Sequence, residues 1–396
     1  PHESYLELAC WYQEIGDINA AAEVLKSSPD YALVQLNLAY LNYLSGKTAE
    51  SEKQLQKAVD EPADFVFPFR LEDKKILEWA IEHSDNWKLK YYLGLLHWSF
   101  GDHIRARELF SDIQRQPEDP YFYFAKSLLF SGEEGYSPEE DLTIAHNSGY
   151  KDWRSYDKLI DYYLRTNQTK QALEFAKEAI RKFPSNNTLK YVYSKCLMAE
   201  GQYADARKAL MKTIILPSEG ARYGRTTYRQ ACIMESLRLY KRGQYKSAIG
   251  LISQSRLWPE NLGAGKPYNP DERIEDFLEG KYREKLGQPN ITEKLYHNII
   301  EFTEGKPSGY SSTDYLYVLA LKYLKQFDKA DDFMNDWEKN KSNNSILEWI
   351  KSVLNNNFNK STEIESLINT QTGGTPWDPK YADSEFEIIK IISKTF

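Results

Sequence analysis

The chain has 396 residues, of which 41% are hydrophobic and 28% are charged, a balance typical of folded chains and not of disordered ones. Its formal net charge of −7 offers no basic surface for a phosphate backbone, which argues against nucleic acid as a partner. No run of about 18 apolar residues occurs, so we expect no membrane-spanning segment. The sequence shows no signal peptide, but it opens Pro1-His2-Glu3 without Met, so we expect a fragment whose upstream part leaves that point open.

Cysteine and histidine patterns argue against a metal site. The three cysteines, Cys10, Cys196 and Cys232, lie far apart among apolar residues of predicted helices, which predicts buried free thiols and fits a reducing compartment. The six histidines form no His-Glu-x-x-His motif, and no Cys-x-x-Cys motif occurs. No nucleophile motif or cofactor loop is present either, so we expect no metal, no cofactor and no enzymatic activity in this segment.

A recurring three-residue pattern predicts paired helices. A turn residue, Gly or Asn, is followed five residues later by a small residue and four residues after that by an apolar or small one. The small residue allows two helices to cross closely. The pattern occurs as Gly101-Ala106-Phe110, Asn167-Ala172-Ala176, Gly201-Ala206-Leu210 and Gly243-Ala248-Ile252.

The spacing of the turn residues shows where the pattern is regular and where it is interrupted. Asn167 and Gly201 are 34 residues apart, whereas Gly46 and Gly101 are 55 apart, which leaves 21 extra residues. The extra residues predict an insertion over 62–83, with an extended aromatic segment at Phe65–Phe69 and an added amphipathic helix near 71–83. Wider spacings farther along the chain predict two more insertions, over 217–229 and 258–273.

The C-terminal part is expected to end the repeat array. Helical periodicity continues over 345–368, and 370–383 predicts a loop. An apolar stripe at 386–392 predicts a helix that caps the final pair, so that loop and cap together cover 370–396. No strand-like alternation persists anywhere. The sequence therefore predicts an all-α fold over 1–396, a right-handed α-solenoid of about nine or ten stacked helix pairs.

The insertion over 217–229 carries three arginines at helical spacing. Arg222, Arg225 and Arg229 are three and four residues apart, so they could share one helix face. One interpretation is an internal ion-pair cluster with the nearby Glu219. The other is an anion site for a carboxylate or phosphate of a partner, because guanidinium presents a planar fork of donors.

The insertion over 258–273 reads WPENLGAGKPYNPDER. Gly265-Lys266 suggests a phosphate loop, but the required earlier glycine is Glu260, and Pro267 stands where Ser or Thr is needed. One interpretation is a rigid loop that packs back on the repeats. The other is a partner-binding loop, since long loops are uncommon without a role. The candidate partner-binding residues in this stretch are Asn261, Lys266, Tyr268 and Arg273.

The repeat pattern resembles the tetratricopeptide repeat superfamily over the whole chain, and the 34-residue spacing is the period of that repeat. The pair that follows Gln288 departs from the pattern, because Thr292 stands at the small position. A narrower resemblance is carried by the strings His2–Ala9, Phe65–Arg70, Leu216–Arg222 and Trp258–Arg273. These look like the C-terminal, repeat-containing half of large bacterial proteins of the Bacteroidetes type, in which an N-terminal β-sandwich of unknown function is similar to galactose mutarotases. That resemblance implies a cytoplasmic setting and supplies no catalytic residue.

Together these features predict a non-catalytic scaffold that mediates protein–protein, interdomain or oligomer contacts for an upstream carbohydrate-acting domain. The expected partner is a protein, the protein's own N-terminal domain or a second copy, held on the concave surface of the solenoid. The alternative is a carbohydrate-associated module, because 14% of the residues are aromatic and aromatic faces stack on sugars. Most of these rings are instead expected to fill gaps between helices.

Overall fold

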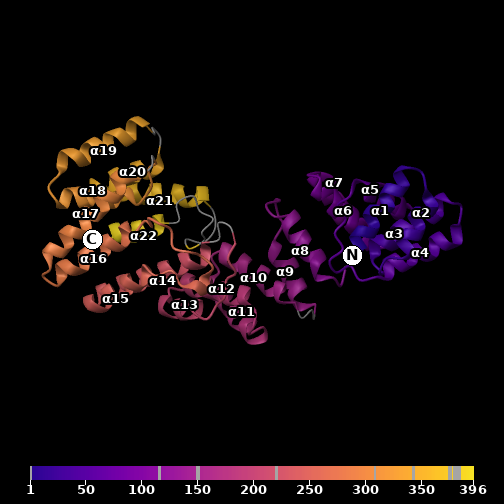
Figure 1. The fold of residues 1–396 in the computed structure, drawn as a ribbon, viewed down its shortest axis with the longest axis horizontal. Coiled ribbons are helices and arrows are strands. Elements are labelled where there is room, and N and C mark those ends of the chain that lie inside the picture. Colours follow the sequence, from indigo (N-terminus) through magenta and orange to yellow (C-terminus); the bar gives the residue numbers. More distant parts are fainter. Residues whose placement is uncertain are drawn as a thin grey trace. The chain divides into compact units, whose positions relative to one another are not determined.

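The computed structural model describes residues 2–114, 117–148, 152–218, 222–306, 309–340, 344–372, 377 and 385–396. Within these ranges it contains 22 α-helices, one short 3-10 helix and no strand (Figure 1), which confirms the predicted all-α fold. The chain divides into two compact units, residues 1–159 and 160–396. Whether both units continue one superhelix stays a prediction.

Unit 1 consists of helix pairs and one additional single helix. Its helices are α1 (His2–Glu14), α2 (Ile18–Lys26), α3 (Ala32–Leu44), α4 (Thr48–Asp60), α5 (Leu71–His83), α6 (Trp87–Ser99), α7 (His103–Ser111), α8 (Pro120–Leu129) and α9 (Pro138–Asn147). The unit boundary falls inside α10 (Trp153–Arg165).

Unit 2 continues with helix pairs and ends in a single helix. Its helices are α11 (Thr169–Lys182), α12 (Asn187–Ala199), α13 (Tyr203–Leu210), α14 (Tyr223–Lys241), α15 (Tyr245–Ser255), the 3-10 helix η1 (Glu260–Leu262), α16 (Arg273–Lys285), α17 (Pro289–Gly305), α18 (Asp314–Tyr323), α19 (Phe327–Asn340), α20 (Ser345–Leu354), α21 (Phe358–Thr372) and α22 (Phe386–Ser393). The 22 described helices match ten pairs together with the predicted added helix α5 and the predicted cap α22.

The predicted turn and crossing residues have the expected geometry. Left-handed backbone occurs at Gly101, Gly201 and Gly243 and at the non-glycine Asn167, with φ between 59° and 82°. The four alanines five residues after these turns, Ala106, Ala172, Ala206 and Ala248, have no exposed surface. The small-residue pattern therefore marks the points where the two helices of a pair touch.

The pair α16–α17 differs from these four pairs in the residue at the helix crossing. Thr292 occupies the small position of α17, is fully buried, and donates its hydroxyl to the Gly280 carbonyl oxygen at 3.0 Å. The facing helix approaches closely as well, because a Cβ at Gly280 would lie 2.6 Å from the Tyr296 ring. Thr292 therefore fits at the small position and adds a hydrogen bond across the pair.

In the insertion over 62–83, Phe65 of the segment expected to be extended lies in a turn with left-handed backbone (φ 58°), and a helix follows it. α5 spans the expected residues, and the segment before it is held to neighbouring helices by Arg70, whose Nη2 donates to Glu3 Oε2 at 2.6 Å. The Trp79 ring of α5 lies 5.5 Å from that of Tyr40 on α3. Because α5 covers it, α3 is buried at every residue from Ala32 to Leu41.

The cysteine prediction is confirmed, since Cys10, Cys196 and Cys232 are buried free thiols. Burial raises the pKa of Cys10 to about 11 and those of Cys196 and Cys232 to about 12. Among the described helices, none combines the length and the apolar character needed to cross a bilayer.

Two helical glycines allow a direct test of the crossing geometry. We expect Gly280→Ala to destabilise the fold by about 1–3 kcal/mol, because the new methyl group would overlap the buried Tyr296 ring. Gly250→Ala is the matched control on α15, where a Cβ meets nothing within 4 Å, and it should stabilise by about 0.5–1 kcal/mol. Thermal unfolding followed by circular dichroism measures both, and equal melting temperatures for the two variants would contradict the packing account.

Candidate functional site

The three arginines of the predicted cluster begin α14 but have different surroundings. Arg222 is the exposed N-cap residue of the helix. Arg225 is 5% exposed, donates its Nη2 to the Ser255 carbonyl oxygen at 2.6 Å, and lies 4.4 Å from the Trp258 ring. Burial and the positive charge of Arg229 lower the pKa of Arg225 to about 10. The structure therefore gives Arg225 internal contacts, and a role in binding a partner stays a prediction.

Arg229 is the centre of a buried ion-pair network in unit 2. Its Nε and Nη2 donate to the two carboxylate oxygens of Glu275 at 2.5 and 2.6 Å, and its Nη1 donates to Glu385 Oε1 at 2.7 Å. Glu275 has no exposed surface. Burial alone would raise the pKa of Glu275, but the charge and hydrogen bonds of Arg229 outweigh it and hold that pKa below its usual value. The acceptor in the internal ion pair is thus Glu275. Glu219, the acceptor expected from the sequence, lies outside the described residues.

The first half of the 258–273 loop is anchored to the repeats. Asn261 Nδ2 donates to the carbonyl oxygens of Leu210 and Thr213 at 3.1 and 2.7 Å. The neighbouring Leu262 is fully buried in a cluster with Leu210, Ile215, Tyr228 and Cys232. This half of the loop therefore packs back over the α13–α14 connection, in line with the first of the two interpretations of the sequence, a rigid loop that packs on the repeats.

The second half of the same loop is exposed. Tyr268 is as accessible as in an extended peptide, and Lys266 is also exposed. These two of the predicted partner-binding residues are therefore positioned to meet a partner without any rearrangement.

Arg273, at the end of the loop, joins α16 to α18. It is 3% exposed and forms a two-point contact with Asp271, with its Nε at 2.9 Å from Oδ1 and its Nη2 at 2.6 Å from Oδ2. Its Nη1 donates to Asp314 Oδ1 at 2.5 Å. Because buried charges need such partners, this geometry positions α16 against α18. A role for Arg273 in binding a partner is an untested prediction.

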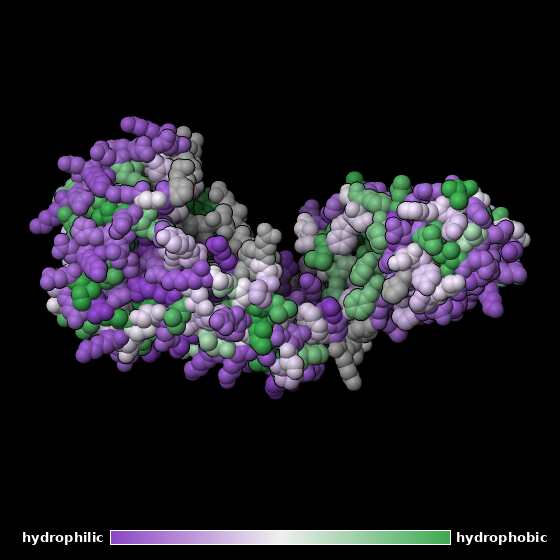
Figure 2. Space-filling model, viewed as in Figure 1, coloured by the Kyte–Doolittle hydropathy of each residue, from purple (hydrophilic) through white to green (hydrophobic). Residues whose placement is uncertain are grey.

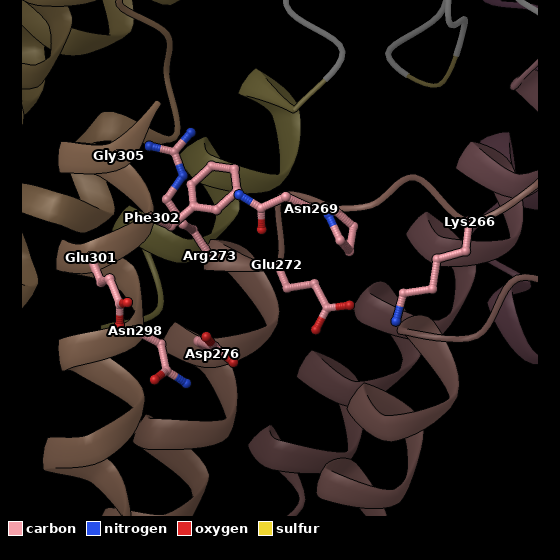
Figure 3. A pocket seen from close by; sticks show the side chains of 10 residues that line it. Lys266, Asn269, Glu272, Arg273, Asp276, Asn298, Glu301, Phe302 and Gly305 are labelled. Carbon is pink, nitrogen blue, oxygen red and sulfur yellow. The ribbon is translucent and has the colours of Figure 1, made fainter. Parts of the chain in front are cut away.

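A polar pocket of about 500 Å³ lies between the exposed half of the loop and the helices α16 and α17 (Figure 3). Lys266 and Asn269 line it from the loop, and Glu272, Asp276 and Glu301 contribute carboxylates from α17 and the start of α16. In the described part of the chain no group of three His, Cys, Asp or Glu side chains is arranged to hold a metal ion.

Two of the three carboxylates at the pocket wall, Glu272 and Asp276, are tied to one arginine. Arg256 donates to Glu272, Asp276 and Glu279 at 3.1, 2.6 and 2.8 Å. Burial raises the pKa of Asp276 to about 6, although Arg256 favours the ionised form. One guanidinium thus serves three carboxylates, and Asp276 keeps a raised pKa in spite of it.

The C-terminal helix α22 lies inside the curve that the helix pairs of unit 2 follow (Figure 1). It packs on the final pair, as predicted, since the Phe386 ring lies 5.1 Å from Trp349 of α20. The residues that follow α22 reach earlier pairs, because the Phe396 ring lies 4.9 Å from that of Tyr240 on α14 and 6.0 Å from that of Phe277 on α16. We call Arg229, Tyr240, Phe277 and Trp349, the residues that meet this segment, the inner surface of unit 2.

The side chains that α22 presents to unit 2 are almost all apolar. Phe386 is 5% exposed, and Ile388, Ile389 and Ile392 have no exposed surface. The polar contacts lie at the two ends of the segment, where Glu385 meets Arg229 and Lys394 Nζ lies 2.7 Å from Glu365 Oε2. The inner surface of unit 2 therefore holds an apolar helix with a carboxylate at its start.

Sequence reasoning missed this arrangement. It placed α22 on the last pair alone and left the concave surface open for a partner. A signal was present in the four large apolar residues of 386–392, because a helix with no paired helix of its own needs another surface to cover them.

A family model for the tetratricopeptide repeat matches residues 163–215. The match runs from the end of α10 to the segment after α13 and contains the 34-residue spacing between Asn167 and Gly201. No curated protein matches the sequence. Residues 163–215 therefore carry the tetratricopeptide repeat, and the chain that surrounds them is an all-α helical-repeat scaffold.

Several solved structures show a distant likeness. A tetratricopeptide repeat protein from Parabacteroides merdae is 14% identical, with a TM-score of 0.32 over 74% of this chain and 98% of that chain. The apo form of RapI is 13% identical, with a TM-score of 0.43 over 85% and 96% of the two chains. The TPR domain of P58(IPK) is 12% identical, with a TM-score of 0.26 over 93% and 99%. At these scores none of the likenesses carries a functional argument.

The two halves of the 258–273 loop should respond differently to mutation. We expect Asn261→Ala to destabilise the fold by about 1–3 kcal/mol, because two carbonyl oxygens lose their donor. The double change Lys266→Ala with Tyr268→Ala should alter stability by no more than about 0.5 kcal/mol, because both side chains are exposed. Chemical denaturation measures both, and a large loss in the double variant would show that the exposed half is structural.

Asp276 predicts a pH dependence of stability. Its pKa is about 6 in the folded chain and near 3.8 when unfolded, so the folded state binds more protons between these values. The resulting stabilisation is present below about pH 4 and is lost as the pH rises through about 6. We expect Asp276→Asn to become more favourable relative to the unmodified chain between pH 4.5 and 7, as measured by melting temperature. The exposed Asp332→Asn change controls for the loss of one negative charge. If the difference in melting temperature between Asp276→Asn and the unmodified chain did not change with pH, the raised pKa of Asp276 would be contradicted.

Proposed function

We propose that this chain is a non-catalytic, protein-binding scaffold whose inner surface in unit 2 receives an apolar α-helix. The observation that carries the proposal is the C-terminal segment 385–396, which contains α22 and is held there by side chains of four different helices. Binding an amphipathic helix through its apolar face is a common mode of peptide recognition.

The chemistry of the inner surface supports a helical guest. Three aromatic side chains from α14, α16 and α20 supply apolar contact, and one guanidinium supplies a charged donor. On the face shown in Figure 2, unit 2 exposes mainly hydrophilic residues, with apolar residues in small groups. Phe277 and Trp349, which contact the C-terminal segment, are buried inside unit 2.

The free energies of apolar burial and of chain ordering are compatible with replacement of α22 by a partner helix. Burying four large apolar side chains stabilises a docked helix by about 6–12 kcal/mol. Ordering the 8 residues of α22 costs about 8–16 kcal/mol of conformational free energy. Apolar burial alone therefore does not hold α22 firmly, and the ion pairs of Glu385 and Lys394 add to its docking. A partner helix with more contacts could replace it.

The narrower predictions extend this proposal. The partner could be a separate protein, a second copy or an upstream domain of the same protein, in keeping with the resemblance to large cytoplasmic bacterial proteins that carry a carbohydrate-acting domain. The carbohydrate-module alternative gains little support, because the largest aromatic side chains, among them Trp337, Trp349, Tyr91 and Tyr282, are fully buried in the core.

A peptide-binding experiment tests the proposal. In the full chain, Ile389→Asp with Ile392→Asp should release α22, because both positions are fully buried. A fluorescent peptide with the sequence of residues 385–396 should then bind this release variant and bind the unmodified chain at least tenfold more weakly, as measured by anisotropy. Glu387→Gln, a change in the same segment at a residue that pairs with Lys390 on α22 itself, is the control and should behave like the unmodified chain. A folded release variant that does not bind the peptide would refute the proposal.

A further inference from the structure

The buried guanidinium of Arg229 has one donor directed at the guest helix. Its Nε and Nη2 are taken by the carboxylate of Glu275, a contact wholly within the α14–α16 framework. Its Nη1 donates to Glu385, the residue that precedes the first turn of α22. The framework pair therefore stays complete without α22, while the third donor requires an acceptor from whatever helix is docked.

The position of that acceptor is chemically specific. A carboxylate at the start of a helix is favoured by the helix dipole, and a charge-assisted hydrogen bond to guanidinium is stronger than one to a neutral acceptor. The Arg229 side chain is only 11% exposed, so water replaces a missing carboxylate poorly. A docked helix without an acid at this place leaves a buried donor without its charged acceptor.

The spacing of the apolar contacts determines which other positions of a docked helix must be apolar. After Glu385, the buried side chains of α22 follow at the first, third, fourth and seventh positions, which are Phe386, Ile388, Ile389 and Ile392. An aromatic side chain, Phe396, then lies between the rings of Tyr240 and Phe277. Glu387 instead pairs with Lys390 on α22 itself, so it contributes charge without meeting Arg229.

We propose, on the basis of the proposed function, that Arg229 is a specificity residue which selects partner helices that begin with a carboxylate and continue with this apolar spacing. The preferred partner is thus an amphipathic helix with an acidic residue at its N-terminus. In the unliganded chain α22 supplies that carboxylate and competes with the partner.

Two isosteric changes in the peptide separate charge from position. We expect the 385–396 peptide with Glu385→Gln to bind the release variant roughly tenfold or more weakly than the unmodified peptide, because the buried charge pair loses one partner. The peptide with Glu387→Gln carries the same change in net charge and should bind within about twofold to threefold. Equal affinities for all three peptides would overturn the inference and leave the proposed function standing, whereas no binding by any peptide would overturn the proposed function.

A change in the scaffold tests the role of Arg229 directly. Arg229→Met with Glu275→Met in the release variant replaces the whole buried pair by apolar groups, a replacement that proteins often tolerate. The preference for the unmodified peptide over the Glu385→Gln peptide should then disappear. A preference that persists in this variant would contradict selection by Arg229.

The intact chain provides a second route that needs no release variant. Glu385→Gln in the full chain should speed hydrogen exchange of the amides of α22 several-fold, because the helix loses its charged anchor. Glu387→Gln is the matched control and should leave that exchange nearly unchanged. Identical exchange rates in the two variants would count against the inference even if the release variant failed to fold.

Discussion

The buried ion pair between Arg229 and Glu275 is the interaction on which the organisation of unit 2 depends. It joins two successive first helices of repeat pairs, α14 and α16, at a point with almost no access to water. A buried charge of this kind is costly unless its hydrogen bonds are satisfied, so the pair restricts how the two helices can stack. The same guanidinium then contacts α22, which links the packing of the repeats to the helix that they hold.

The repeat pattern was sufficient to predict the helix pairs and the turns that join them. Turn residues such as Gly201 and crossing residues such as Ala206 obey local rules, since left-handed backbone favours glycine and close helix crossings need small side chains. The added helix α5 was also predictable, because its amphipathic pattern is contained within its own 13 residues. Thr292 shows the limit of the pattern, since its partner Gly280 lies on the other helix of the pair.

The contacts that define the candidate site could not be read from the sequence. Arg229 and Glu385 are 156 residues apart, and no local period relates them. The spacing of the arginines predicted one helix, but it could not show that Arg229 pairs with Glu275 while Arg225 donates to a backbone carbonyl oxygen. Likewise, the apolar stripe of α22 predicted a buried helix, whereas the set of helices that buries it follows from how the repeats curve in space.

Hydrogen exchange of the α22 amides in the unmodified full chain tests the central claim most directly. A helix of 8 residues is too short to persist alone in water, so any lasting protection must come from docking. The account predicts that α22 is protected well above the level of an unstructured peptide, through contacts with α14, α16 and α20. Exchange of residues 386–393 at the rate of an unstructured peptide would contradict it, because the inner surface of unit 2 would then hold no helix.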